Sequence, residues 1–207
     1  MGILDLERLR AAPLQREPFD YVVVDNFVRA EHVARLLGDF PEIRGHGSYP
    51  LAHLRSGPGF AELAAELEGD DLRQEIAAKF AIDLGNRPTM ITVRGYSDGK
   101  DGRIHTDSAT KLITLLLYMN PEWQARSGRL RLLRSPDNLE DYAVEIPPVA
   151  GMMVAFRRSN VSFHGHHPHR GPRRSLQLNW VTDQSVVRRE LTRHGWSARL
   201  KSLLPFS

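Results

Sequence analysis

The stretch "GRIHTDSATKLITLLLYMN", residues 102–120, places a histidine and an aspartate shortly before a run of aliphatic residues. Side chains of an extended segment alternate between two faces, so residues i and i+2 share one face. If residues 103–107 are extended, His105 and Asp107 project together and offer two ligands to one cation. The aliphatic run that follows predicts a buried strand over residues 112–119.

Strand-like runs dominate the chain after residue 88, and helix-like runs dominate it before. The later runs are short and rich in aliphatic residues, and turn signals such as Ser127-Gly128 and Gly171-Pro172 separate them. Helices followed by strands predict an α+β, mainly β fold whose strands form an antiparallel sandwich or barrel. We predict helices over 30–39, 60–69 and 72–80, and strands over 21–27, 90–96, 112–119, 129–133, 152–158 and 175–181.

The length suits one well-packed domain. The chain has 207 residues, of which 41% are hydrophobic and 26% charged, and these are ordinary values for a globular protein. It contains no internal repeat and no linker-like stretch. We therefore predict a single domain over 1–207, with an N-terminal helical support over about 1–87, a strand-rich core over about 88–183 and a C-terminal helical tail over about 184–207.

The composition excludes several kinds of site. The chain has no cysteine, so disulfides, thiolate metal sites and a cysteine nucleophile are excluded, and a metal must be held by histidines and carboxylates. The formal net charge of +3 is weak, so no nucleic-acid partner is expected. The basic segment 188–201 is interpreted as a solvated helix face, with nucleic-acid binding as the alternative.

The apolar and charged residues also bear on location. No apolar run approaches the ~20 residues that cross a bilayer, so no membrane partner is expected. The first 18 residues carry charge in every turn, which predicts no secretory signal peptide and a cytoplasmic protein.

His164 is the candidate for a third metal ligand. It follows the predicted strand 152–158 and lies 59 residues after His105. Two histidines and one carboxylate form the facial set that binds non-haem Fe(II) and leaves open positions for substrate and O₂. Three nearby histidines are alternatives, but the position after the strand and the spacing to Arg173 favour His164. These alternatives are His166, His167 and His169.

A candidate for binding a carboxylate follows nine residues after His164. Arg173 and Ser175 share one face of the predicted last strand. A guanidinium binds a carboxylate through two hydrogen bonds, and a nearby hydroxyl adds another donor. Arg174 is the alternative, but the Arg-x-Ser spacing favours Arg173. The pattern predicts a carboxylate-bearing co-substrate next to the metal.

From about residue 88 to 183 the chain resembles the prolyl 4-hydroxylase-like branch of the Fe(II)/2-oxoglutarate-dependent oxygenases. The matching pieces stand in family order: "VRGYSDGKDGRIHTD", "LLLYMNPEW", "SGRLRLL", "VAGMMVAFRR" and "SFHGHHPHRGPRRSLQLNW". The early piece "PFDYVVVDNFV" also resembles the entry strand and helix of that branch. The resemblance implies a double-stranded β-helix (jelly-roll) core with the N-terminal helices packed on one sheet.

The resemblance also assigns roles to residues. It implies that His105, Asp107 and His164 bind Fe(II), and that Arg173, assisted by Ser175, binds the distal carboxylate of 2-oxoglutarate. It further implies an enzyme that uses Fe(II), 2-oxoglutarate and O₂, hydroxylates a substrate and releases succinate and CO₂.

Two tyrosines bear on the co-substrate pocket that the resemblance implies. Tyr96, nine residues before His105, matches a pocket tyrosine of relatives. Some close relatives carry a second pocket tyrosine on the strand after the His-x-Asp motif, and the equivalent position here is Leu117. Strand alternation then puts Tyr118 on the opposite face, as a core or sheet-face residue.

The substrate is not identified by the sequence. Relatives hydroxylate prolyl residues of proteins, free amino acids and other small molecules, so a small-molecule or peptidyl substrate is expected, and exposed strand edges are compatible with a homodimer. A non-catalytic jelly-roll module that binds metal or senses a ligand is the alternative, as is a zinc hydrolase. Arg173 and Ser175 argue against the hydrolase, which needs no carboxylate clamp beside its metal.

Overall fold

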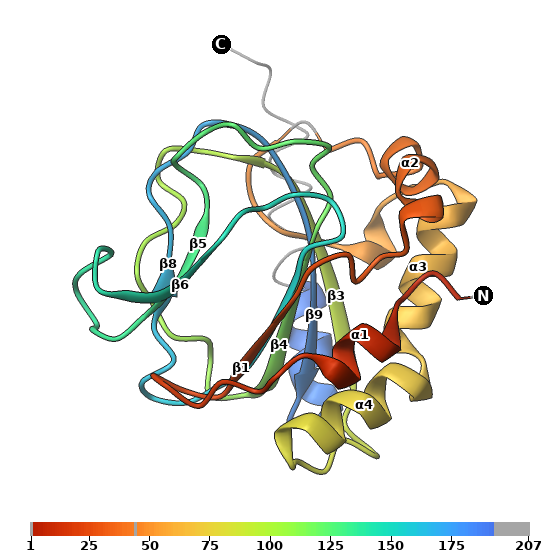
Figure 1. Cartoon of the computed structure of the whole chain (residues 1–207). Helices are drawn as coiled ribbons and strands as arrows, with labels where there is room; N and C mark the ends of the chain where they lie inside the picture. Colours follow the sequence, from red (N-terminus) through yellow and green to blue (C-terminus); the bar gives the residue numbers. More distant parts are fainter. Residues whose placement is uncertain (1, 44, 193–207) are drawn as a thin grey trace.

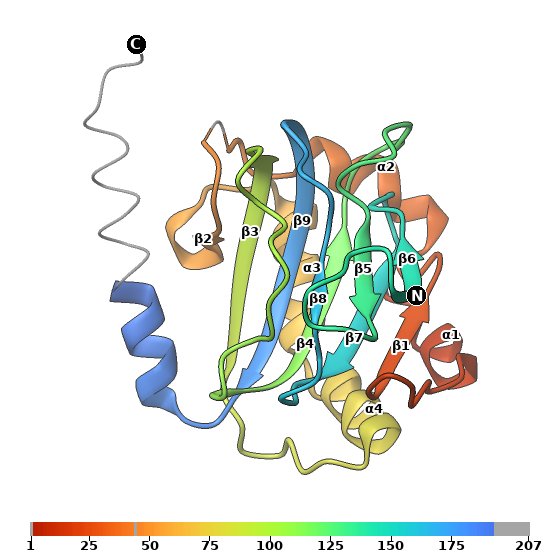
Figure 2. The same cartoon turned by 90° about the vertical axis from the view of Figure 1, so that its left-hand side faces the viewer.

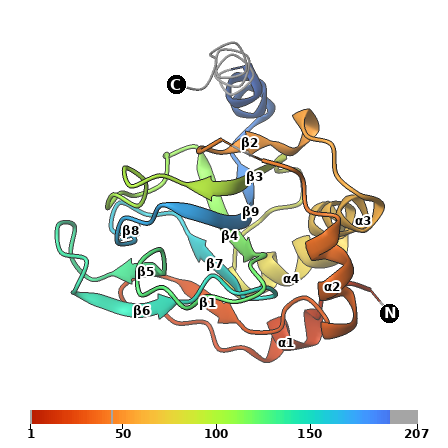
Figure 3. The same cartoon turned by 90° about the horizontal axis from the view of Figure 1, so that it is seen from above.

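The structure is a computed structural model that describes residues 2–43 and 45–192. Its strands form two antiparallel sheets, a major sheet in the order β1-β7-β4-β9-β3-β2 and a minor sheet in the order β6-β5-β8. Seen from above, the minor sheet lies on one side of the major sheet and the helices on the other (Figure 3). The strands are β1 (Tyr21–Val24), β2 (Tyr49–Pro50), β3 (Thr89–Ser97), β4 (Lys111–Tyr118), β5 (Leu130–Leu133), β6 (Tyr142–Ile146), β7 (Met153–Arg157), β8 (His164–Gly165) and β9 (Gly171–Val181).

The helices cover the outer face of the major sheet (Figure 1). In α3 the residues Phe60, Leu63 and Leu67 recur at helical spacing and are fully buried against that sheet. The helix α4 ends where Ala81 adopts a left-handed backbone with φ of 49°. The helices are α1 (Leu6–Ala11), α2 (Ala30–Gly38), the 3₁₀ helix η1 (Leu51–His53), α3 (Pro58–Glu68) and α4 (Asp70–Phe80), and residues 184–192 are also helical.

Strand β4 separates two hydrophobic cores. Its residues Ile113, Leu115 and Leu117 belong to the core between the helices and the major sheet. Leu116 and Tyr118 face the other way, into the core between the two sheets. Burying one such side chain stabilises the fold by about 1.5–3 kcal/mol. The double-sided burial explains why the sequence of β4 is nearly continuous in aliphatic residues.

The predicted fold class is confirmed: the chain is mixed α+β with a jelly-roll-like pair of sheets and N-terminal helices on one of them. Each predicted helix and strand is present, with ends that differ by a few residues. The elements α1, η1, β2, β6 and β8 were not predicted from the sequence. Strand β6 (Tyr142–Ile146) is mostly half-buried and has a weak apolar pattern, and β2 and β8 are very short.

The structure describes only the first part of the predicted C-terminal tail. The predicted C-terminal tail starts in the helical residues 184–192, and its part from 193 to 207 lies outside the described residues. Among the described residues, no helix is both long enough and apolar enough to cross a membrane.

Candidate metal centre

The two predicted histidine ligands lie side by side because their backbones pair. His105 N donates to His164 O at 3.1 Å, and His164 N donates to His105 O at 3.0 Å, so the segment before β4 extends the minor sheet beside β8. Figure 2 shows β8 in front of the major sheet. The two imidazole rings are 4.4 Å apart between centroids. With Asp107, they offer one ligand atom each within 4.8 Å of one another.

Hydrogen bonds orient both imidazoles. His105 Nδ1 lies 2.8 Å from Arg103 O, and His164 Nδ1 lies 3.0 Å from Ser162 O. A carbonyl oxygen only accepts, so each Nδ1 carries the proton and each Nε2 keeps the lone pair that binds a metal. The ring of Phe156 packs 4.8 Å from that of His164 and covers it with apolar surface.

The Asp107 carboxylate is fixed at both oxygens. Lys111 Nζ donates to Oδ1 at 2.7 Å, and Thr114 Oγ1 donates to Oδ2 at 2.5 Å. Asn179 Nδ2 donates in turn to Thr114 Oγ1 at 2.8 Å. A carboxylate has about four lone-pair sites, so these two donors leave it free to bind one metal ion.

Electrostatics prepare the three groups for metal binding. Burial acts to raise the pKa of Asp107, but the charge of Lys111 and the hydrogen bonds outweigh it, so the pKa lies below its usual value and the group is ionised. Burial, followed by the charge of His105, lowers the pKa of His164 to about 4, so its imidazole is neutral at pH 7. Two imidazoles and one carboxylate that converge on one point fit a divalent ion of the Fe(II) type.

A cavity of about 140 Å³ extends from these groups between the two sheets. We call it the central cavity. Strands of the major sheet form its floor, and the loop after β3 and the loop after β8 form its rim. Besides the three ligand candidates it is lined by Ser48, Thr92, Arg94, Asp101, Gly102, Thr114, Leu116, Tyr118, Leu130, Gly165, His166, Arg173, Ser175 and Gln177.

Arg173 lies in the central cavity and is only 5% exposed. Its Nε donates to Gly128 O at 2.8 Å, and its Nη2 lies 3.5 Å from Tyr118 Oη. Both contacts are neutral, and burial lowers the pKa of the guanidinium. A buried cation whose contacts are neutral is stabilised by an anionic ligand, so this end of the cavity suits a carboxylate.

The two consecutive arginines separate as strand alternation predicts. Arg173 lines the central cavity together with Ser175. Arg174 points to the helix side, where Nη1 donates to Leu37 O at 3.4 Å and the guanidinium lies 5.2 Å from the ring centre of Phe40.

The prediction for Tyr96 is wrong. Tyr96 lines a separate cavity with Phe40 and Arg174, away from the candidate ligands. The pairing of β3 with β9 shifts register between Arg94 and Tyr96, and a bulge of this kind turns the next side chain to a new direction. Thr92 and Arg94 are the residues of this strand that line the central cavity.

Tyr118 is buried in the core as predicted, but the prediction that Leu117 and not Tyr118 faces the co-substrate pocket is wrong. Leu117 packs in the core under the helices, whereas Tyr118 lines the central cavity beside Arg173. The prediction took Leu117 as the equivalent of the family tyrosine, but the pairing of β4 with β9 shifts register between Lys111 and Ile113, and the cavity face of β4 carries Tyr118. The chain therefore has its pocket tyrosine on β4.

The histidines after His164 have different surroundings. His166 is 7% exposed and lines the central cavity, and burial together with the charge of Arg173 lowers its pKa to about 4. His167 and His169 do not line the cavity. Of the four histidines in this segment, only His164 joins the cluster of candidate ligands among the described residues.

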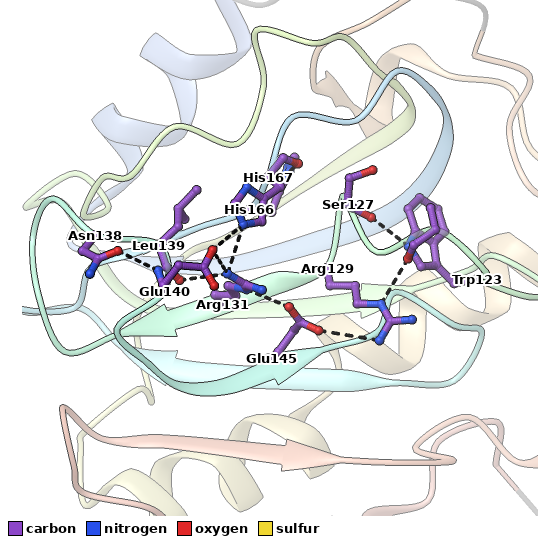
Figure 4. Close-up of polar contacts among 11 residues, drawn as sticks. Trp123, Ser127, Arg129, Arg131, Asn138, Leu139, Glu140, Glu145, His166 and His167 are labelled. Carbon is purple, nitrogen blue, oxygen red and sulfur yellow. Dashed lines mark hydrogen bonds and ion pairs between the residues drawn. The ribbon is translucent and has the colours of Figure 1, made fainter.

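His167 and His169 hold the rim loop against its neighbours, and Figure 4 shows His167 beside Glu140 and Arg131. His167 Nε2 lies 2.7 Å from Glu140 Oε1 and 3.1 Å from Arg131 Nη1, and Arg131 also pairs with Glu145 at 2.7 Å. The ring of His169 lies 4.6 Å from the centroid of Trp123. These contacts hold the loop that carries His166 against the minor sheet.

Thr114 was not predicted as a site residue. Its signal was a lone threonine within the aliphatic run of β4. Thr114→Val keeps the shape but removes the hydrogen bond to Asp107, so we expect the affinity for Fe(II) or Mn(II) to fall about 10- to 100-fold. Anaerobic metal titration measures this. Thr92→Val, in the same cavity on β3, is the matched control, and an equal loss in both variants contradicts the account.

The stability of the metal-free protein is expected to depend on pH. The pKa values of His164 and His166 lie at about 4 in the folded protein against an ordinary 6.5. Between these values the unfolded chain binds more protons, so the free energy of unfolding falls as the pH drops through this window. The loss is roughly 3 kcal/mol per histidine when complete. Urea unfolding at pH 7 and pH 5 measures this fall in the free energy of unfolding. We expect His166→Gln to lose less stability between these pH values than the wild type. An equal loss in both proteins contradicts the lowered pKa of His166.

Comparison with known proteins adds two findings. A profile of the 2OG-Fe(II) oxygenase superfamily matches residues 91–182, a segment that contains all three candidate ligands and Arg173. Among curated protein sequences, none matches the chain.

Solved structures share the fold over most of the chain. A Pseudomonas putida prolyl-4-hydroxylase is similar with a TM-score of 0.61 and 20% identity, over 84% of this chain and 99% of that chain. A Trichoplax adhaerens prolyl hydroxylase, solved with a hypoxia inducible factor peptide fragment, has a TM-score of 0.60 and 18% identity, over 88% and 93% of the two chains. A Burkholderia pseudomallei oxidoreductase of the 2OG-Fe(II) oxygenase family has a TM-score of 0.56 and 14% identity, over 86% and 90%.

Proposed function

We propose that the chain is a 2-oxoglutarate-dependent dioxygenase that hydroxylates its substrate and releases succinate and CO₂, and the match of its segment 91–182 to the 2OG-Fe(II) oxygenase superfamily supports this proposal. One observation carries the proposal. The central cavity joins a cluster of two histidines and an aspartate to a buried arginine whose contacts are neutral.

In this proposal His105, Asp107 and His164 bind the iron. The histidines bind through Nε2, because each Nδ1 is committed to a backbone carbonyl. Lys111 and Thr114 hold the Asp107 carboxylate in one orientation. Three protein ligands on one face leave the opposite positions open for small molecules.

Arg173 binds the distal carboxylate of 2-oxoglutarate in the same proposal. Tyr118 and Ser175, which are paired across β4 and β9, lie beside it. Their hydroxyls are further donors to a carboxylate. Because Gly128 O and Tyr118 Oη already hold the guanidinium, little side-chain entropy is lost when the anion binds.

Bound Fe(II) and 2-oxoglutarate supply the activation of O₂, with oxidative decarboxylation of the 2-oxo acid. The chain positions these partners and limits access of water. Leu116 and Leu130 line the cavity with apolar surface, and Phe156 covers His164. Apolar walls favour reaction of one aimed C–H bond over side reactions with solvent.

The substrate is a prolyl or other protein residue or a small molecule. Support for a peptidyl substrate comes from the structural neighbours, which are named prolyl hydroxylases. A module that binds metal without turnover and a zinc hydrolase are the alternatives, and the buried carboxylate site at Arg173 favours the oxygenase over the hydrolase.

The test measures conversion of 2-oxoglutarate to succinate and CO₂ by the Fe(II)-loaded protein in air. We expect slow turnover without substrate, a requirement for Fe(II) and O₂, and none when Zn(II) replaces Fe(II). If the Fe(II)-loaded protein binds 2-oxoglutarate and yields no succinate with any candidate substrate, the sensing module replaces the enzyme.

A further inference from the structure

The floor of the central cavity has a second basic group besides Arg173. Strand β9 pairs with β4 and β3, and in this register Ser175 lies between Tyr118 on β4 and Arg94 on β3. Two residues further along β9, on the same face, Gln177 lies opposite Thr92 of β3. The β3 side of the floor is thus polar, and the β4 side carries Leu116.

Arg94 lies beside the path that the proposed function assigns to 2-oxoglutarate. That path follows β9 from the metal ligands to Arg173, where one carboxylate meets the guanidinium and the 2-oxo acid end meets the metal. Arg94 lies one strand over, on the β2 side, where its Nη2 donates to Ser48 Oγ at 3.3 Å. Both carboxylates of the co-substrate are accounted for without it.

The present ion pair of Arg94 is exchangeable. Its Nη1 lies 2.8 Å from Asp101 Oδ2, yet this buried nitrogen makes no well-aligned hydrogen bond. Asp101 has donors of its own, Asp98 N at 2.8 Å and Ser97 Oγ at 3.3 Å. Asp101 therefore stays hydrogen-bonded within its loop when Arg94 turns to another anion.

We propose that Arg94 and Ser48 bind a carboxylate of the substrate that is hydroxylated, so that this substrate is an acid. The proposal rests on the proposed function, because it assumes that 2-oxoglutarate occupies the path to Arg173. A guanidinium offers paired donors that match a carboxylate, and the Ser48 hydroxyl adds a third. The side chains of Arg94 and Asp101 line the cavity and are 25% and 22% exposed, so solvent reaches this part of it.

The charges of the cavity show which contact a substrate carboxylate would displace. Asp107 is matched by Lys111 and by the metal that the ligands imply, and Arg173 is matched by the co-substrate. Asp101 is then the counter-ion of Arg94 in the resting protein. A substrate carboxylate that displaces this contact gains the guanidinium and leaves Asp101 on its backbone and serine donors.

The first experiment uses the full chain loaded with Zn(II) and 2-oxoglutarate, and acetate as the simplest carboxylate. The Nε–H signal of Arg94, identified by its loss in Arg94→Lys, is followed by NMR while acetate is added. We expect a saturable shift with acetate and none with acetamide. Separate measurement of 2-oxoglutarate binding shows whether the proposed function itself has failed.

Two acids of one loop give a matched pair of variants. Asp101→Asn keeps the oxygen that accepts from Asp98 N but removes the charge beside Arg94, so acetate is expected to bind about tenfold more tightly. Asp98→Asn removes a neighbouring charge that pairs with Arg170 at 3.9 Å, and we expect little change. A purely structural ion pair predicts an unresponsive Arg94 signal in all three proteins.

The source of the carboxylate is found by competition with acetate. Free amino acids test a backbone carboxylate, and peptides with blocked ends and an internal glutamate test a side chain. Displacement of acetate by either class supports the proposal and names the source. Failure of both classes, an Arg94 signal that ignores acetate, or an uncharged compound that stimulates 2-oxoglutarate turnover overturns it.

Discussion

His105→Ala is expected to abolish Fe(II)-dependent turnover and to leave the folded protein as stable as the wild type. His105 is exposed and its Nδ1 contact is local, so the variant removes a metal ligand without opening a cavity. Two remaining ligands hold the metal weakly. Metal titration, succinate formation and urea unfolding of the metal-free protein measure the three parts of this expectation.

Asp107→Ala is expected to differ from His105→Ala in its effect on stability. It also removes a ligand, but it leaves Lys111 and Thr114 without their buried acceptor. Breaking a buried ion pair from one side costs about 3–5 kcal/mol, so this variant should lose stability as well as turnover. If His105→Ala kept Fe(II)-dependent turnover near that of the wild type, His105 would not be a ligand.

Arg173→Gln is expected to weaken 2-oxoglutarate binding about 100-fold, because two charge-assisted hydrogen bonds are lost. Metal affinity should stay unchanged, since Arg173 lies at the other end of the cavity from the ligands. Calorimetric titration of the Zn(II)-loaded protein with 2-oxoglutarate measures the loss.

Arg174→Gln is the matched control for that variant. Arg174 is the next residue on the same strand, and it contacts Leu37 O and the ring of Phe40 on the helix side. We expect 2-oxoglutarate to bind this variant as it binds the wild type. If Arg174→Gln lost 2-oxoglutarate and Arg173→Gln kept it, the assignment of the carboxylate clamp would be reversed.

The sequence predicted those parts of the site that depend on short spacing. His105 and Asp107 lie two residues apart, and Arg173 and Ser175 share a strand face, so local backbone geometry brings each pair together. The contact of His164 with His105 is long-range. It followed from the resemblance to a family and from the position of His164 after a strand, since spacing alone does not show that β8 pairs with the segment around His105.

The errors come from interruptions of strand alternation. Tyr96 and Tyr118 were assigned from the resemblance to a family, and in each strand a register shift precedes the residue that was assigned. A bulge adds one residue to one strand and reverses every later assignment on it. Nothing in "VRGYS" or "TKLIT" marks its position, because the bulge depends on pairing with β9.

The contacts of Thr114 and Arg94 around the site could not be predicted from the sequence for another reason. Thr114 meets Asp107 because a turn folds β4 back beneath the ligand loop, and Arg94 meets Asp101 and Ser48 because three separate segments converge. Such contacts are set by packing of whole strands. A polar residue within an aliphatic run was the available signal for Thr114, and a charged residue within the apolar run of β3 was the signal for Arg94.

The most direct test of the central claim is the visible absorption spectrum of the metal-free protein under anaerobic conditions, as Fe(II) and then 2-oxoglutarate are added. We predict a charge-transfer band that appears only when both are present and that is lost in His105→Ala. A protein that binds Fe(II) and shows no such band at saturating 2-oxoglutarate would contradict the claim that the central cavity joins an iron site to a co-substrate site.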